Sequence, residues 1–196
     1  MIYAILDIEC LNLDPEKSEI FDIGIMVLDE KWNKKFTLEH KIIIENKKLI
    51  TENLENNPAL KYYDEAIWKK NGVPVDIALN HISVALNTLN DKVVPVGHNV
   101  KFDLAHLEYN FKKYNIKNPF YHLTLDSISL ALFCGIIEGE AMKRYDLGSV
   151  TKKFKAKHGN AHTAMGDVDA VYNLICNLKS KDKSKFMIEC TEEEAK

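Results

Sequence analysis

The chain has 196 residues, of which 46% are hydrophobic and 28% charged, and its formal net charge is −3. This length suits one compact domain with its own core, and the composition is that of a soluble globular protein. The charge excludes a protein whose bulk electrostatics alone attract nucleic acid, although divalent ions would reverse the local sign of an acidic site.

The arginine count, the cysteine spacing and the lengths of the apolar runs exclude further classes of protein. Arg144 is the only arginine, which disfavours sequence-specific reading of guanine by paired arginine contacts. The four cysteines form no C-x-x-C pair and so give no support to a zinc site. No run predicts a membrane span, and the start MIYAILDIEC lacks the basic region of a signal peptide. We therefore expect a cytoplasmic protein with free thiols.

The first part of the chain predicts β structure followed by a polar segment. Residues 2–9, 20–28 and 36–44 are apolar runs joined by short polar links, as in an antiparallel meander. Residues 46–74 are rich in Asn, Lys and Glu, with a predicted short helix over 60–70. Its aromatic residues are interpreted as local core rather than as platforms for stacked bases; they are Tyr62, Tyr63 and Trp68.

Helices and strands alternate in the second part. Predicted helices cover 75–89, 102–114, 127–134, 147–154 and 163–178, and predicted strands cover 93–97 and 121–125. Asp126 is expected to cap the helix that follows it. The order predicts an α/β fold: one mixed five-stranded sheet, its first three strands antiparallel, flanked by helices. We expect a single domain over 1–180 and a charged, flexible tail over 181–196.

Three short motifs carry acidic or histidine side chains. Asp7 and Glu9 end the first strand, where positions two apart point to the same face. Taken alone, this pair is a common polar exit from a buried strand.

The second motif, Gly97-His98-Asn99-Val100-Lys101-Phe102-Asp103, opens a helix after a buried strand. Asp103 would lie in the first helical turn, where an acid also suits the helix dipole, and Phe102 would face the core. His98 is interpreted as a structural histidine. In the third motif, His162 would lie in a loop and Asp167 on the inner face of the last helix.

The motifs follow one another in the order D-x-E, H-N-x-x-F-D and H-x-x-x-x-D. In this the chain resembles the DEDDh 3′→5′ exonucleases, the family of the polymerase proofreading subunit, ribonuclease T and oligoribonuclease, over residues 1–180. Further matches lie between the motifs, at Asp14-Pro15, residues 23–27, Leu125-Asp126-Ser127 and Leu147-Gly148. The resemblance implies a ribonuclease H-like fold and release of 5′-mononucleotides from single-stranded DNA or RNA 3′ ends.

The resemblance also implies a metal site and a catalytic base. Asp7, Glu9, Asp103 and Asp167 would hold two divalent metal ions, Mg²⁺ or Mn²⁺, which suit carboxylate ligands. His162 would be the general base that takes a proton from the attacking water, because histidine titrates near neutral pH. His158, four residues earlier, is the alternative base.

Substrate contacts are expected in the stretch after D-x-E and in the second motif. Members commonly continue D-x-E with T-T-G-L, whereas Cys10-Leu11-Asn12-Leu13 stands here. In the family this stretch approaches the terminal nucleotide, so Leu11 and Leu13 are the expected base wedges, with Asn99 and Phe102 as further contacts. Residues 46–74 are longer than the shortest members need and either shape the substrate groove or cover the sheet.

Partners and alternatives stay open at this point. The lysines at 152, 153, 155 and 157 either hold phosphates or form a solvated surface. A polymerase partner and a homo-oligomer are both compatible with the sequence, and neither DNA nor RNA is preferred. A competing hypothesis is a non-catalytic exonuclease-like module that recruits a polymerase or an RNA-processing complex. A related endonuclease is the third.

Overall fold

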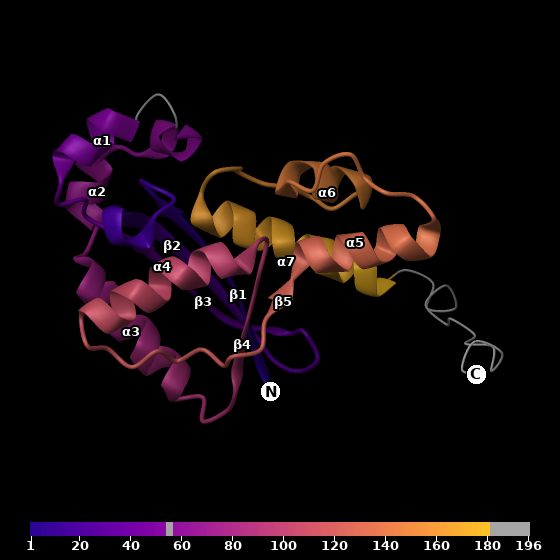
Figure 1. Ribbon diagram of the computed structural model, residues 1–196. Helices are drawn as coiled ribbons and strands as arrows, with labels where there is room; N and C mark the ends of the chain where they lie inside the picture. The colour runs from indigo at the N-terminus through magenta and orange to yellow at the C-terminus, as the bar shows by residue number, and fades with distance from the viewer. Residues whose placement is uncertain (54–56, 181–196) are drawn as a thin grey trace, which may run out of the picture.

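Five strands form one mixed sheet in the computed structural model, which describes residues 1–53 and 57–180 (Figure 1). In sheet order they are β3 (Lys34–Lys41), β2 (Ile20–Leu28), β1 (Ile2–Cys10), β4 (Val93–Gly97) and β5 (Leu125–Asp126). β1, β2 and β3 pair antiparallel, while β4 runs parallel to β1 and β5 parallel to β4. The predicted fold class and the antiparallel meander are confirmed.

Helices cover both faces of the sheet. α3 (Val75–Asn87) and α4 (Val100–Lys113) pack on one face, where Leu79 and Leu107 meet Leu6 of β1. α7 (Ala164–Ser180) packs on the other face, where Val171 meets Ile5. α5 (Ser127–Glu138) and α6 (Leu147–Lys153) lie beside α7 and share a small cluster with it. A short 3-10 turn, η1 (Pro15–Lys17), follows β1.

The start of α7 lies against β2 at a glycine. A Cβ atom at Gly24 would stand 2.7 Å from the carbonyl carbon of Ala164, so no larger residue fits without moving the helix. Gly24 pairs with Asp7 across β1 and β2. This close approach therefore brings the first turn of α7 beside the carboxylate of the first motif.

One carboxylate joins the starts of two helices. Asp126, the last residue of β5, accepts a hydrogen bond from the Ile128 amide at 2.8 Å and so caps α5, as predicted. Its other oxygen accepts from the Val100 amide at 2.8 Å, at the start of α4. The two helices therefore begin at the same point beyond the carboxyl end of the sheet.

Residues 46–53 and 57–74, here called the cap segment, form α1 (Lys47–Asn53), η2 (Pro58–Tyr62) and α2 (Glu65–Asn71). The single predicted helix over 60–70 is wrong, because Asp64 caps a new helix by accepting from the Ala66 and Ile67 amides. Trp68 is buried and donates to the Phe21 carbonyl, whereas Tyr62 is 50% exposed. The local-core interpretation therefore holds for Trp68 and fails for Tyr62.

Two predicted strands differ at their ends. β3 ends at Lys41 rather than at residue 44; beyond it Ile42 still donates to the Phe21 carbonyl of β2 but forms only an isolated bridge with Val73. The strand predicted over 121–125 shrinks to the two residues of β5. The tail over 181–196 lies outside the described residues. Within the described part, no helix is both long and apolar enough to cross a membrane.

Candidate active site

β1 carries two acidic side chains to one face of the sheet. Asp7 lies opposite Gly24 and Glu9 opposite Asp22, and the regular pairing of β1 with β2 breaks just after Glu9. Side chains two apart on a strand share a face, so both carboxylates lie on the side covered by α7. The geometry expected for the first motif is confirmed.

α4 brings the third carboxylate to this place. Asn99 adopts a left-handed backbone with φ of 60°, and this turn starts the helix. Asp103 lies in the first helical turn, is 3% exposed, and accepts a hydrogen bond from the Ile8 amide at 3.0 Å. Ile8 separates Asp7 from Glu9, so this bond ties Asp103 to the first motif.

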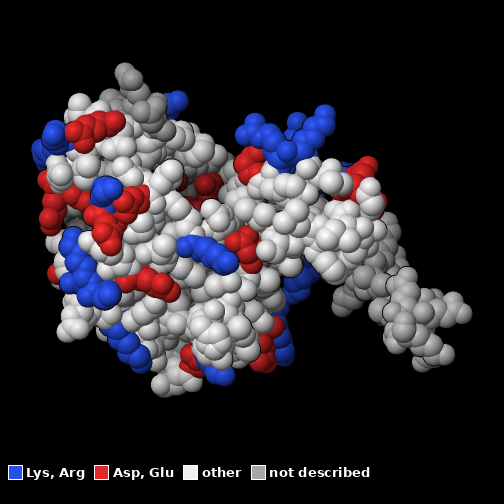
Figure 2. Space-filling model, viewed as in Figure 1, with Lys and Arg blue, Asp and Glu red and all other residues white. Residues whose placement is uncertain are grey.

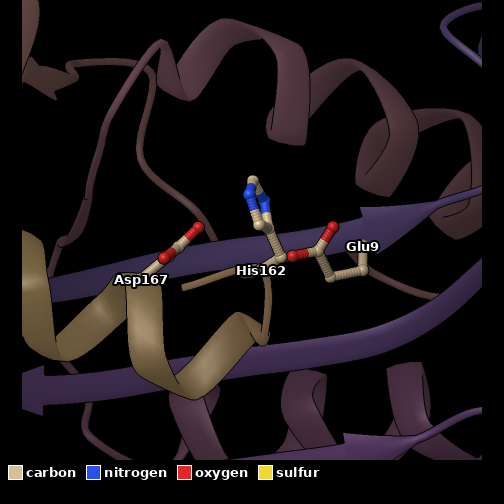
Figure 3. A group of neighbouring side chains, drawn as sticks. All are labelled: Glu9, His162 and Asp167. Atoms are coloured by element: carbon tan, nitrogen blue, oxygen red, sulfur yellow. The ribbon is translucent and has the colours of Figure 1, made fainter. Parts of the chain in front are cut away.

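The third motif meets Glu9 on the face of the sheet that α7 covers. One potential ligand atom from each of Glu9, His162 and Asp167 lies within 4.8 Å of the others (Figure 3). His162 is exposed and lies in the loop before α7, with φ of 62°, while Asp167 comes from the first turns of the helix. The predicted loop and helix positions of these two residues are confirmed.

Other residues near the motifs have different surroundings. His158, the alternative base, lies with Nε2 2.9 Å from Oδ1 of Asp167 and is not in the group formed with Glu9. His98 Nδ1 lies 2.8 Å from the Ser127 hydroxyl, in keeping with a structural role. Asp169, two residues beyond Asp167, is exposed.

The acidic residues raise one another's pKa values. Burial, followed by repulsion from Asp103 and Glu9, raises the pKa of Asp7 well above its ordinary value. Burial and repulsion from Asp167 raise the pKa of Glu9 to about 8. Burial raises the pKa of Asp103 to about 7. Such a group is costly without a cation, because carboxylates forced together resist ionisation.

A cavity of about 500 Å³ opens beside these carboxylates. β1, the loop after it and the cap segment supply most of its lining, and His162 lies at its edge. In Figure 2 acidic side chains lie recessed in a hollow between the cap segment and the region around α6. The lining consists of Ile8, Glu9, Cys10, Leu11, Asn12, Leu13, Asn53, Asn57, Pro58, Ala59, Phe102 and His162.

Comparison with known proteins decides the family. The sequence profile of an exonuclease family, named for RNase T, matches residues 75–175. This chain belongs to that exonuclease family. The match spans α3, β4, α4, β5, α5, α6 and most of α7. No curated protein matches the exonuclease chain in sequence.

Solved structures share the fold of this chain. E. coli exonuclease I in complex with a dT13 oligonucleotide has a TM-score of 0.72 at 14% identity. The zinc ion-bound form of the E. coli exonuclease I complex with single-stranded DNA has a TM-score of 0.74 at 16% identity. An exonuclease I complex with SSB-Ct has a TM-score of 0.70 at 13% identity. Each match covers 94% of this chain but only 42% of the other chain.

The residues of this site fit the divalent ions that the family implies. Asp7, Glu9, Asp103 and Asp167 supply oxygen donors, which hard cations such as Mg²⁺ prefer. Burial and repulsion from neighbouring carboxylates raise the pKa values of Asp7, Glu9 and Asp103, and a bound cation would favour their ionised forms. The donor set therefore suits a metal centre at the junction of β1, α4 and α7.

The expected substrate contacts divide into two sets. Leu11, Leu13 and Phe102 all line the cavity; Leu11 is 2% exposed and Leu13 is 82% exposed. Phe102 is half-buried in this wall, so the prediction that it faces the core is wrong. Asn99 is exposed at the start of α4 and is not among the lining residues. Its backbone amide instead donates to Asp126 at 3.3 Å.

Two charged residues of this site escaped the sequence analysis. Asp22 is buried in β2, and Lys41 at the end of β3 forms an ion pair with it at 2.6 Å. The signal was an acid inside the apolar run 20–28, where an unpaired charge is costly. Among the lysines before His162, Lys153 pairs with Glu140, and all four are exposed.

Proposed function

We propose that residues 1–180 form a 3′→5′ exonuclease domain that hydrolyses single-stranded nucleic-acid ends to 5′-mononucleotides. One observation carries the proposal: Glu9, His162 and Asp167 converge at the edge of a cavity, next to Asp7 and Asp103. Two divalent ions, Mg²⁺ or Mn²⁺, held by the carboxylates would activate the attacking water and stabilise the leaving oxygen.

The remaining chemistry belongs to the chain's own residues. An imidazole nitrogen of His162 takes the proton of the attacking water, and its exposed position at the edge of the cavity leaves room for that water. Leu13 and Phe102 hold the terminal nucleotide through apolar contact with its base, while the buried Leu11 supports the cavity wall behind them instead of acting as the expected base wedge. The lysines around α6, visible in Figure 2, are placed to attract the phosphates that follow.

Relatives of the same fold support a single-stranded substrate. Structures of exonuclease I include complexes with dT13 and with single-stranded DNA. By analogy, a single strand would enter this cavity with its 3′ end toward the carboxylates. The cavity lies between the cap segment and β1, so we expect these to select the strand end.

Product analysis with Mg²⁺ on matched single-stranded DNA, RNA and dinucleotides tests the proposal. We expect mononucleotides released from the 3′ end, no cutting of a closed circle, and loss of activity in Asp167→Ala. Asp169→Ala is the matched control, because Asp169 lies on the same helix but is exposed. Cutting of the circle would favour the endonuclease hypothesis. Stabilisation by Mn²⁺ without hydrolysis of any substrate would favour the non-catalytic module.

A further inference from the structure

A row of three charged side chains crosses β1, β2 and β3 beside the site. Glu9 pairs with Asp22, and Asp22 pairs with Lys41. Directly opposed residues in antiparallel strands point to the same face, so the three side chains are neighbours on the face covered by α7. The order is acid, acid, base. The middle acid therefore lies between a proposed metal ligand and a cation.

Asp22 is buried in a way that needs an explanation. The residue is 2% exposed within a strand whose other residues are all apolar or glycine. Its Oδ2 atom accepts from Lys41 Nζ at 2.6 Å, while Oδ1 has no hydrogen-bond partner among the described residues. Buried charges are retained where they are paired and serve a purpose, because their desolvation is costly.

The same oxygen of Asp22 also reaches the start of α7. The Ala164 amide donates to Oδ2 over 3.4 Å, and an anion suits the N-terminal end of a helix. Ala164 lies between His162 and Asp167 in sequence, and its backbone rests on Gly24. Asp22 thus contacts β3 through Lys41 and α7 through Ala164, while it neighbours Glu9 on β1.

We propose that Asp22 and Lys41 form a positioning pair that fixes the His162–Asp167 segment relative to Glu9. Asp22 is not itself in the group of potential ligand atoms formed by Glu9, His162 and Asp167. It acts through the backbone of α7, and Lys41 partly offsets the negative charge that Asp22 adds beside Glu9. This inference rests on the proposed exonuclease function.

Asp22→Asn and Lys41→Met test the pair, measured by kcat and KM at saturating Mg²⁺ and by calorimetric binding of Mn²⁺ without substrate. A misplaced ligand segment should lower kcat by about tenfold or more, with KM within about twofold. We expect both substitutions to weaken Mn²⁺ binding. A purely electrostatic role would give opposite signs, because removing Lys41 leaves the site more negative and would tighten Mn²⁺ binding.

Matched variants separate positioning from general stability. Lys41→Arg keeps the ion pair and should restore kcat and Mn²⁺ affinity. Glu39→Gln removes the other, half-exposed partner of Lys41 and should change neither. In the double variant Asp22→Asn/Lys41→Met, kcat and Mn²⁺ affinity should be no lower than in the more impaired single variant, because the two residues act as a unit.

Three results would overturn the inference. One is an Asp22→Asn protein whose melting temperature falls while kcat and Mn²⁺ affinity stay at the wild-type values. The others are opposite effects of the two substitutions on Mn²⁺ affinity and full additivity in the double variant. If the wild-type chain hydrolyses no substrate, the proposed function fails instead. The signs of the Mn²⁺ affinity changes then still decide the role of Asp22 and Lys41.

Discussion

Most carboxylates of the site come from a strand and a helix, whereas its proposed catalytic histidine comes from an exposed loop. Asp7, Glu9 and Asp103 come from β1 and the first turn of α4, between the buried clusters on the two faces of the sheet. His162 lies in the exposed loop before α7, and the Tyr62 ring lies 6.5 Å from its own. The fold thus preorganises the proposed metal ligands, whereas the proposed base depends on a loop.

We expect the largest effect from removing one carboxylate, which tests the part of the site held by β1 and α4. In Asp7→Asn we expect kcat to fall by at least ~10³-fold, because the residue would hold the ions on which the reaction depends. Repulsion within the group also falls, so the metal-free protein should melt at a higher temperature than the wild type. Single-turnover hydrolysis and calorimetry in EDTA measure both. A fall in both quantities would contradict the proposed role.

Removing the proposed base tests the part of the site that depends on the loop before α7. His162→Ala should lower kcat by about 10²–10⁴-fold while leaving Mn²⁺ affinity within a few-fold of wild type. His158→Ala is the matched variant from the same loop, since His158 contacts Asp167 instead. We expect it to lower kcat by less than tenfold. Steady-state kinetics over pH compares the two, and a larger loss in His158→Ala would reverse the assignment of the base.

A smaller effect is expected in the pH dependence of stability, which tests the electrostatics of the carboxylates. The pKa of Glu9 rises from 4.5 to about 8 on folding, so the folded protein binds more protons between these values. The favourable contribution of Glu9 to the free energy of unfolding is therefore complete below about pH 4.5 and is lost as the pH rises through about 8. We expect the metal-free melting temperature to fall over this window. Mg²⁺ should stabilise the protein more at pH 8 than at pH 5, and equal stabilisation would argue against a carboxylate metal site.

The cavity wall should give the smallest effect. Leu13 is 82% exposed, so Leu13→Ala should leave the melting temperature unchanged. Loss of apolar contact with a base should raise KM by about threefold to tenfold, with kcat close to wild type. Ile77→Ala removes a similarly exposed side chain from α3, outside the cavity, and should change neither constant. Equal KM values in the two variants would exclude Leu13 from the substrate site.

The sequence predicted the sheet and the motif positions because both rest on local patterns. The apolar run 20–28 coincides with β2, and Asp126 caps α5 as its position before a helix suggested. The helix over 60–70 failed because Asp64 competes locally by capping α2. β5 has only two residues because the chain before it meets β4 at an isolated bridge between Val93 and Phe120 and pairs continuously only at Val96 and Gly97.

The residues that sequence missed depend on contacts between distant segments. Asp22 and Lys41 meet only through the register of β2 on β3, which the apolar pattern does not specify to one residue. The exposure of Tyr62 likewise depends on how the cap segment folds around Leu60 and Trp68. Motif spacing identifies side chains of the right chemistry, but strand register decides which others become their neighbours.

Asp126 supports the site without belonging to the group of potential ligand atoms. Its two oxygens accept from the Val100 amide at the start of α4 and from the Ile128 amide in the first turn of α5, and α4 carries Asp103. A change of Asp126 to alanine would release both helix starts at once, so damage would spread along two separate stretches of sequence. An inactivating substitution at Asp126 would therefore resemble the loss of a catalytic residue, although Asp126 acts by holding the starts of two helices in place.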